Sequence, residues 1–590
     1  MYLKKSKSNG KIYLSFVQGY RKEGKVKQKT VEKLGYLEDL EKIYPDPVAH
    51  FKQVAKERTL NESHVKTIEI DLLSKLPDKA SFRKNLGYAA PKAVYSQLGL
   101  REFFQSKQRR LDVEYNLNNI FSLLVFNRFL FPSSKKHAFE TKNSFFESSD
   151  FSLNDVYRSL DYFYKYSRSI QQHLHKQVCS LIGRDSQLAY YDVTNYYFEI
   201  PYEDEDEYDG EGNLIKKGYR KRGPSKEHRK DPIVQMGLLM DSNGIPMAFN
   251  TFSGGKSEKL SLLPTVRRVK RDFELERIIV VADRGLNTSD NTAFLSGKNH
   301  DDMTENDGYV YGQSVLGANK KFKTWVLEQK DYRIDDVLDK NEDTVLFKHK
   351  SRIHAKTVHL KNSDGNRTQK IEIYQKQMVY YSEKYAKKQR RDRDKVIAKA
   401  KDLIANPDRY TRSTSIGAAG YINNIKFSKQ TGEISDGQSL SINEEKIRRE
   451  EHYDGYYSIV TSEKDLSDLE IRNIYKGLWE IEESFRIIKG EFKARPVFLQ
   501  TDAHVDAHFL ICFVALVLMR ILEKMLGEKY TVGQIRESLI SYSCSHLDQN
   551  YYLFDHRDDV IKMVESVFGF DLSKKIMSQA EIKKILKYQR

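Results

Sequence analysis

Cysteine is scarce in this chain, which has three among 590 residues: Cys179, Cys512 and Cys544. An odd number of widely separated cysteines excludes a disulfide framework and a zinc ribbon, and it favours a reducing compartment. Secretory features are lacking too, because the first residues contain no apolar stretch of the signal-peptide type. We therefore expect no signal peptide.

Long hydrophobic runs are also lacking. The longest, residues 509–519, is about half of what a membrane-spanning helix needs, and His508 and Arg520 bracket it. The sequence therefore predicts a buried core helix here and no membrane partner.

Acidic residues are absent from the first 22 positions. Residues 1–37 read as a short β-hairpin or meander, because residues 11–18 and 25–34 alternate around a turn at Glu23-Gly24. Its cations form a basic arm that either contacts a DNA backbone or belongs to a soluble edge sheet. These cations are Lys4, Lys5, Lys7, Lys11, Arg21 and Lys22.

Positive charge exceeds negative charge over the whole chain, by 99 − 83 = 16, and the pI is near 9.2. On a large chain this favours a polyanionic partner, most often nucleic acid, although a basic housekeeping enzyme has the same balance. A length of 590 residues predicts roughly three to five domains.

Residues 45–185 have mainly helical periodicity, and 113–131 read as one strongly amphipathic helix that Pro132 ends. A helical block before a catalytic region is a candidate DNA-binding region. From residue 187 the pattern changes to strands: 188–199, 233–240 and 246–252, then a helix at about 260–271 and a strand at 277–282.

Two acids stand on buried strands. Asp192 is in the middle of the apolar segment 188–199, and Asp283 follows the β-branched run 277–282. An acid at the C-terminal end of a buried strand lies where α/β sheets bind ligands. A buried carboxylate must be paired or hold a cation, or be bonded to neighbouring backbone.

A third acid lies on segment 465–496, which reads as a single helix with a capping box at Ser467 and Glu470. Tyr475, Glu482 and Lys489 follow at steps of seven, so they form a line along the helix. This line is either an ordinary solvated face or a site for chemistry on an anion.

Between these regions, residues 320–454 read as a β-rich insertion. Four short strand-like pieces occur at 345–349, 356–360, 370–374 and 378–381, and a very basic helix at 384–403. An acidic run, 203–209, and a basic run, 216–230, read as a long solvated loop whose basic half also has the charge to contact phosphates.

Together these stretches resemble the DDE transposases of bacterial insertion sequences, in the subgroup with a β-strand insertion before the final Glu. The matching segments are YYDVTNYYFE, GPSKEHRKDPIVQMGLLMDSNGIPMAF, VVADRGLNTSDN, DGYYSIVTSE and YKGLWEIEESFRIIKGEF. The resemblance implies an α/β fold: a ribonuclease H-like catalytic core interrupted by the insertion, preceded by a helical region and the N-terminal β-hairpin.

The family pattern on the last helix is Tyr-x2-Arg-x3-Glu-x6-Lys. It maps to Tyr475, Glu482 and Lys489, but Leu478 stands at the arginine position. Lys476 or Arg472 would supply the missing charge, or the arginine is not needed here.

The resemblance implies that Asp192, Asp283 and Glu482 are the catalytic residues and metal ligands. Three carboxylates in a basic protein suit two Mg²⁺ or Mn²⁺ ions, which promote in-line displacement at phosphorus. Trp479 either packs in the core, which we favour, or stacks on a base. The predicted DNA contacts are Tyr475, Lys489, Arg486, Trp479, Lys226, Arg229 and Arg284.

The implied function is cut-and-paste transposition: cleavage at the transposon inverted repeats and strand transfer into target DNA by a homodimer on paired ends. The implied location is the cytoplasm of a prokaryote, at the nucleoid. The alternatives are a stand-alone metal-dependent nuclease and a catalytically silent DNA-binding protein derived from a transposase.

The predicted division is a basic β-hairpin (1–44), a helical region (45–185), the first part of the core (186–319), the insertion (320–454), the second part of the core with the catalytic helix (455–526) and a C-terminal helical region (527–590).

Overall fold

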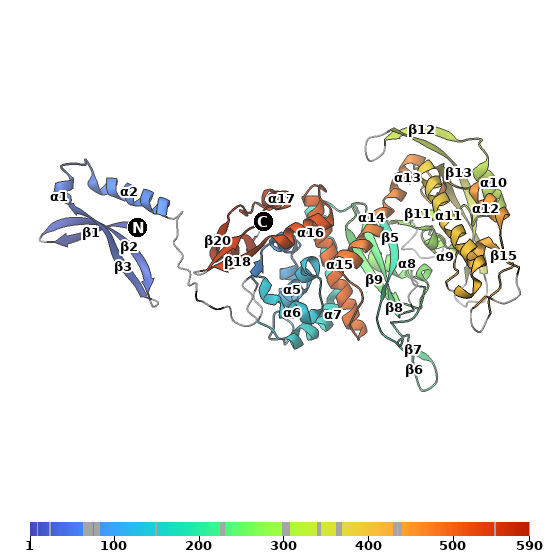
Figure 1. Ribbon diagram of the computed structural model, residues 1–590, viewed down its shortest axis with the longest axis horizontal. Helices are drawn as coiled ribbons and strands as arrows, with labels where there is room; N and C mark the ends of the chain where they lie inside the picture. Colours follow the sequence, from blue (N-terminus) through green and yellow to red (C-terminus); the bar gives the residue numbers. More distant parts are fainter. Residues whose placement is uncertain are drawn as a thin grey trace. The chain divides into compact units, whose positions relative to one another are not determined.

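The computed structural model divides the chain into two compact units (Figure 1): Met1–Phe82 with His546–Leu553, and Arg83–Ser545 with Phe554–Arg590. The structure describes all residues except 9, 23–24, 63–72, 74, 76–82, 148–149, 225–229, 298–306, 339–343, 362–367, 413, 429–432, 435–438, 548–549 and 589–590.

The first unit contains an antiparallel sheet of three strands, which is the meander among the two predicted alternatives: β1 (Tyr2–Ser8), β2 (Lys11–Lys22) and β3 (Lys25–Tyr36). The predicted turn at Glu23-Gly24 lies outside the described residues. Two helices follow, α1 (Leu37–Leu40) and α2 (Pro47–Glu62). Phe51 of α2 packs edge-on against the buried Phe16 of β2, while Lys4, Lys5, Lys7 and Lys11 are exposed.

The second unit is mixed α/β and is built around a nine-stranded sheet. The strand order is β12-β13-β14-β17-β11-β10-β5-β8-β9. In chain order the strands are β5 (Leu188–Tyr197), β8 (Ile233–Asp241), β9 (Pro246–Ser253), β10 (Ile279–Ala282), β11 (Gly308–Gln313), β12 (Arg333–Leu338), β13 (Thr344–Lys361), β14 (Thr368–Tyr381) and β17 (Tyr456–Thr461).

Three central strands, β5, β10 and β11, are parallel, and the other pairings in this sheet are antiparallel. Helix α8 (Leu262–Phe273) covers one face, where Val266 packs in a core with Tyr191 and Val280. The predicted order of three strands, a helix and a fourth strand is therefore confirmed.

The strand pieces predicted between residues 345 and 381 are not four but two, β13 and β14. The polar residues between the apolar pieces belong to the same ladder, since Lys350 pairs with Val379 and Ala355 pairs with Tyr374. Polar side chains interrupted the hydrophobic pattern without interrupting the backbone pairing. The expected basic helix is present as α11 (Glu383–Ala405).

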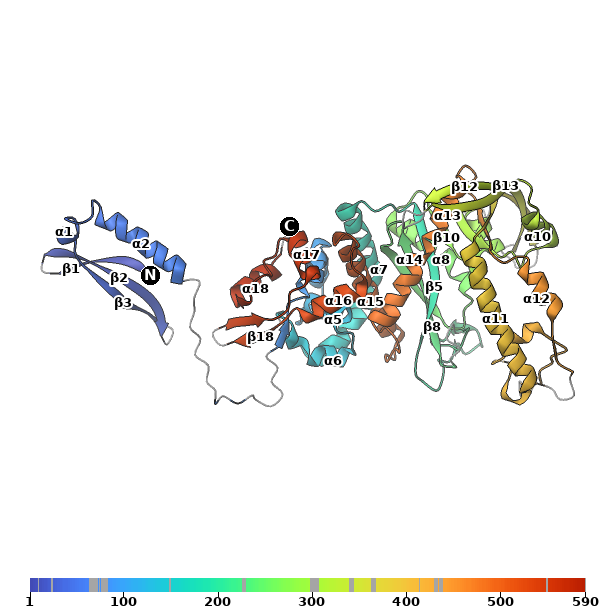
Figure 2. The ribbon, with the colours of Figure 1, turned by 45° about the horizontal axis from the view of Figure 1, so that its top comes forward.

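Helix α15 (Asp502–Met525) lies between the sheet and the N-terminal helices of this unit (Figures 1 and 2). It is long and apolar enough to cross a membrane by composition, but 94% of its most apolar window is buried inside the unit. Its Phe509 and Phe513 contact Tyr196 of β5 and Phe249 of β9. The prediction of a buried core helix is confirmed.

The helices that α15 contacts include α5 (Leu117–Leu130), which is buried nearly all round. The prediction of an amphipathic helix at this place is wrong, because α15 and other helices cover it on several sides.

Other helices of the unit are α3 (Ala89–Gln97), α4 (Leu100–Gln108), α6 (Lys135–Glu140), α7 (Leu153–Ile182), α9 (Ser289–Phe294), α10 (Lys320–Leu327), α12 (Glu444–Glu451), α16 (Val532–Ser541), α17 (Asp559–Phe568) and α18 (Gln579–Leu586).

The segment predicted as one helix is broken. It consists of α13 (Asp468–Lys476), α14 (Leu478–Arg486) and a π-helical turn, η7 (Ile487–Glu491). The predicted capping box of Ser467 and Glu470 is confirmed. The break has a tertiary cause: the Tyr190 hydroxyl of β5 donates to the Ile474 carbonyl at 3.0 Å, which in a continuous helix would accept from residue 478.

Glycine is required at this break. A Cβ on Gly477 would lie 2.1 Å from the Tyr190 hydroxyl oxygen. We expect Gly477→Ala to displace Tyr190 and to lower the free energy of unfolding by about 1–3 kcal/mol, the usual cost of overpacking. Urea unfolding measures this change.

Gly490→Ala is the matched control, because a Cβ at Gly490 meets nothing within 4 Å. We expect it to change stability by less than about 0.5 kcal/mol. Equal stabilities of the two variants would contradict the steric role of Gly477.

Candidate active site

Two of the three predicted acids lie at the same level on neighbouring strands. In the parallel pair β5–β10, Val281 is opposite Tyr190 and Ala282 is opposite Tyr191. Continuing this register by one residue places Asp283 level with Asp192. Because side chains alternate between faces, both acids lie on the face opposite Tyr191 and Ala282, away from the core under α8.

Asp283 comes directly after the last residue of β10, and its side chain shapes the turn that follows. Its Oδ1 accepts a hydrogen bond of 2.8 Å from the Gly285 backbone N–H. The side chain is nonetheless exposed, whereas Asp192 is half-buried within β5. The Asp283 carboxylate therefore lies at the open end of a buried strand, as the sequence predicted.

Helix α14 runs alongside β5 on this same face (Figures 1 and 2). Gly477, just before α14, is against Tyr190, and the Lys489 ammonium is 5.7 Å from the centre of the Tyr196 ring. Both segments therefore run in the same direction. Glu482 is about 7 Å beyond Gly477 along a helix, and Asp192 is about 7 Å beyond Tyr190 along a strand, so the two acids are at similar heights.

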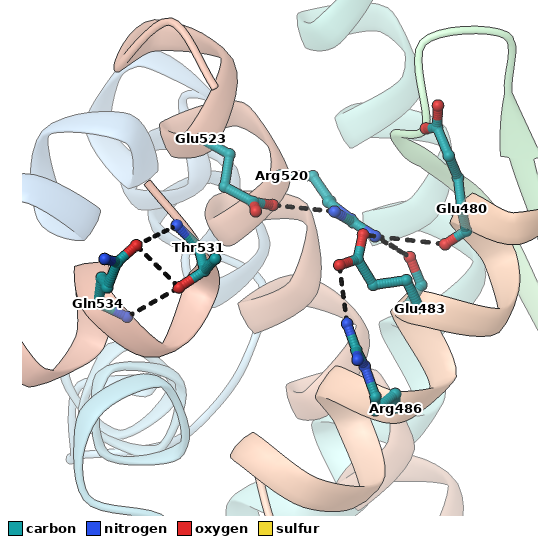
Figure 3. A network of polar contacts seen from close by, with 8 residues as sticks. Glu480, Glu483, Arg486, Arg520, Glu523, Thr531 and Gln534 are labelled. Carbon is teal, nitrogen blue, oxygen red and sulfur yellow. Dashed lines mark hydrogen bonds and ion pairs between the residues drawn. The ribbon is translucent and has the colours of Figure 1, made fainter. Parts of the chain in front are cut away.

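Glu482 differs from its acidic neighbours on α14. The buried Arg520 of α15 donates to the Glu483 carboxylate at 3.0 Å and to the Glu480 backbone carbonyl at 3.2 Å (Figure 3). Glu482 is exposed. Glu483 and the Glu480 backbone thus hold α14 against α15, while Glu482 has no part in that network among the described residues.

Tyr475 lies beside Asp283. A Cβ added to Gly312, the β11 residue level with Asp283, would be 2.3 Å from the Tyr475 hydroxyl and 3.2 Å from the Arg284 backbone nitrogen. Burial raises the pKa of Tyr475, and the Asp283 carboxylate raises it further. This phenol therefore stays protonated near neutral pH and is able to donate a hydrogen bond.

The donor set of Asp192, Asp283 and Glu482 is all oxygen, which suits Mg²⁺ or Mn²⁺. The strand register supports a shared site for the two aspartates. Within the described part of the chain, no three His, Cys, Asp or Glu side chains stand close enough together to form a metal-binding group. The exposed Glu482 side chain must therefore turn towards the aspartates for all three to share an ion.

A basic pocket of about 550 Å³ adjoins the Asp283 end of the sheet. Its cationic and histidine side chains are Arg284, Lys321, Arg352, His354 and Lys356. Burial lowers the pKa of Lys356 to about 8. Only Arg284 among these was predicted. The missed signal is the i, i+2, i+4 spacing of Arg352, His354 and Lys356, which places all three on one face of β13.

The other predicted DNA contacts are scattered. Trp479 is 44% exposed, so the expectation that it packs in the core is wrong. The Arg486 guanidinium is exposed and pairs with Glu483 at 3.0 Å. Lys489 is half-buried beside Tyr196, and Arg284 is exposed at the mouth of the basic pocket.

Lys226 and Arg229 lie outside the described residues. The acidic and basic runs around them pair with one another, so the loop is not simply solvated. Asp204 pairs with Arg220 at 2.6 Å, and Asp206 pairs with Lys221 at 3.0 Å.

No nearby side chain simply replaces the arginine that the family pattern has at position 478. Leu478 is half-buried. The Arg472 guanidinium stacks on the Phe347 ring at 4.7 Å, and burial lowers its pKa. Lys476 is exposed and remains the candidate for the missing charge.

Two family models match the chain. Residues 3–65 match the IS1634 family transposase, N-terminal domain. Residues 207–518 match the transposase DDE domain, and these 518 − 207 + 1 = 312 residues are just over half of the 590. This match contains Asp283 and Glu482 but begins after Asp192, whose place in the site rests on strand register.

Among solved structures, the crystal structure of the Mos1 mariner paired end complex with Mn is similar to part of the chain. Sequence identity is 10%, and the similarity covers 40% of this chain and 68% of that one. The TM-score of 0.11 is too low to support any statement about fold or function. Among curated proteins, none matches this sequence.

Proposed function

The chain belongs to the DDE transposase family of insertion sequences, and from this we propose that it cuts DNA at the ends of such an element and joins the freed 3′ ends to target DNA. The observation that carries the proposal is the register of β5 and β10, which sets Asp192 level with Asp283. Both face the side of the sheet along which α14 carries Glu482.

The sheet supports a ribonuclease H-like core for this chemistry. Its segment β9-β8-β5-β10-β11 contains an antiparallel meander followed by two strands parallel to the first. The strands β12, β13 and β14 extend the same sheet beyond β17, at the edge opposite β9. We propose that they are the insertion between the core and the catalytic helix.

Each residue of the site has a proposed role. Asp192, Asp283 and Glu482 would hold two Mg²⁺ or Mn²⁺ ions, which, when bound, stabilise charge at the reacting phosphate and activate the attacking water or 3′-hydroxyl. Tyr475, neutral beside Asp283, would donate a hydrogen bond to a phosphate oxygen. The basic pocket, with Arg284 at its mouth, would hold the neighbouring strand through its phosphates.

The proposed partners follow from the reaction. The two element ends must be joined to one target, so we propose a homodimer on paired ends. Lys489, Arg486 and Trp479 are exposed or half-buried along the segment that carries Glu482, and we propose that they contact DNA there. The proposed place of action is the prokaryotic cytoplasm, at the nucleoid.

The test uses the DNA that flanks the gene, where the proposal expects inverted repeats. The purified protein is incubated with a DNA end and a target plasmid, with Mg²⁺, with Mn²⁺ or with a chelator. We expect 3′-end cleavage and joining to the plasmid with either ion and neither reaction with the chelator. Cleavage without joining would instead identify a nuclease, and binding without cleavage would identify a silent DNA-binding protein.

A further inference from the structure

A second cavity, of about 290 Å³, lies away from the acids. It is lined by residues from the end of α5, the start of α6 and the segment 493–499, with Tyr157 of α7 and His508 of α15. We call it the Lys135 pocket. Its walls combine apolar groups, including Pro132 and Val497, with buried cations.

Two of these cations, Arg128 and Lys135, are 6% and 7% exposed. Among the described residues, the Arg128 guanidinium donates only to neutral acceptors: the carbonyls of Phe492 at 2.9 Å, Lys493 at 3.2 Å and Ser133 at 2.9 Å. Its buried Nε–H has no hydrogen-bond partner among the described residues. Arg128 therefore retains donor capacity and an unneutralised charge.

Lys135 is less satisfied still. Among the described residues its ammonium has one hydrogen-bond partner, His508 Nδ1 at 2.7 Å. His508 Nε2 donates to the Ala494 carbonyl at 3.1 Å, so Nδ1 is left as the acceptor. An ammonium has three N–H groups, so two of those on Lys135 remain available to donate hydrogen bonds. Burial, together with the nearby positive charge of Arg128, lowers the pKa of Lys135 to about 7.

Four other buried cations have carboxylate partners. Arg184 pairs with Asp241 at 2.8 Å, Lys270 with Asp307 at 2.6 Å, Arg393 with Asp454 at 2.5 Å, and Arg520 with Glu483 at 3.0 Å. Lys350 instead has backbone carbonyls and two aromatic rings. A buried charge without a counter-charge is costly. Lys135 and Arg128 are two such cations in one pocket, and a bound anion would neutralise them.

We propose that the Lys135 pocket binds a phosphate group of the DNA strand, with Lys135 and Arg128 as its charged ligands. The inference rests on the proposed function for the identity of the strand. Phe498, 73% exposed at the pocket, offers a ring on which an adjoining base stacks. The apolar walls accommodate the sugar.

The pocket lies within reach of a strand held at the acids. Its Val497 backbone N–H donates to the carbonyl of Tyr197, the last residue of β5, at 3.3 Å. Tyr197 is five residues from Asp192 on that strand, which is about 17 Å. A strand held at Asp192 would therefore reach the pocket a few nucleotides from the reacting phosphate.

The first experiment needs no DNA. The melting temperature is measured as inorganic phosphate replaces chloride at constant ionic strength. We expect phosphate to raise the melting temperature of the wild type and of Lys136→Met, the exposed neighbour on α6. The rise should be lost in Lys135→Met, which should itself melt no lower than the wild type because it removes a buried charge.

A wild type that phosphate does not stabilise would overturn the proposal, and this result depends on no variant. So would an equal rise in Lys135→Met. Glu482→Gln should keep the full rise, so loss of cleavage and loss of phosphate binding are separate outcomes.

The second experiment identifies the source of the phosphate. Neutral methylphosphonates are placed one at a time along the element-end strand, and binding is measured by fluorescence anisotropy. We expect one position a few nucleotides from the cleavage site to weaken wild-type binding about tenfold, with no effect on Lys135→Met. If no position behaves in this way while inorganic phosphate still binds, the occupant is a free anion and the DNA assignment is wrong.

Discussion

Replacement of Glu482 by Gln is expected to lower the rate of DNA cleavage by about 10³-fold, with little change in DNA binding or stability. If Glu482 is the metal ligand proposed above, its loss removes several kcal/mol of transition-state stabilisation, and each 1.4 kcal/mol is about tenfold in rate. The side chain is exposed and outside the Arg520 network, so its amide should not disturb the fold. Cleavage rate, anisotropy with the element end and urea unfolding measure the three properties.

Glu483→Gln is the matched control one residue along the same helix. Glu483 pairs with the buried Arg520 at 3.0 Å and with Arg486 at 3.0 Å. We expect this variant to lose about 1–2 kcal/mol of stability and to keep its cleavage rate. The opposite result, an active Glu482→Gln and an inactive Glu483→Gln, would show that the active-site acid is misassigned.

Replacement of Arg520 by Leu is expected to cost about 3 kcal/mol of unfolding free energy. The Arg520 guanidinium joins α15 to α14 and also pairs with Glu523 at 3.0 Å, and the side chains of Arg520 and Glu523 are 10% and 13% exposed (Figure 3). Removing one partner of a buried ion pair leaves the other charge uncompensated. Urea unfolding near neutral pH measures the loss.

The loss should shrink as the pH falls. Burial raises the pKa of Glu523, and Arg520 opposes that rise, so the variant should have a still higher folded-state pKa. A carboxyl whose pKa is higher folded than unfolded takes up its proton more readily in the folded state. Acidification through that folded pKa therefore removes the uncompensated charge of the variant.

The control is Lys524→Leu, four residues after Arg520 on the same helix. In its pair with Glu528, at 2.9 Å, the side chains of Lys524 and Glu528 are 32% and 66% exposed, so we expect a change below about 0.5 kcal/mol. A deficit of Arg520→Leu that stays constant between about pH 7 and pH 5 would show that lost packing, rather than the uncompensated carboxylate, causes it.

Local pattern was sufficient for much of the fold. The apolar segments around Asp192 and before Asp283 predicted buried strands, and the run before Arg520 predicted a core helix. Such patterns work because burial of a strand or helix requires a recurring set of apolar residues. They failed for β13 and β14, where polar residues such as Lys350 and Arg352 lie within the paired strands.

Partners across the fold are not encoded in local periodicity. The segment around Gly477 has a continuous helical pattern, yet the helix breaks where Tyr190, 287 residues before Gly477, binds the Ile474 carbonyl. The Lys135 pocket likewise joins residues from α5, α6 and α15. Neither Lys135 nor Arg128 stands out in the sequence.

By itself, the sequence determined the kinds of element, their order, the family and the three candidate acids, because each of these is recorded in residue type and spacing along the chain. Only the tertiary structure decided that Asp192 and Asp283 share one level and one face, that Glu483 is structural while Glu482 is exposed, and which buried cations have no carboxylate partner among the described residues. Register, burial and charge compensation are properties of residues brought together from distant segments, and no local pattern contains them.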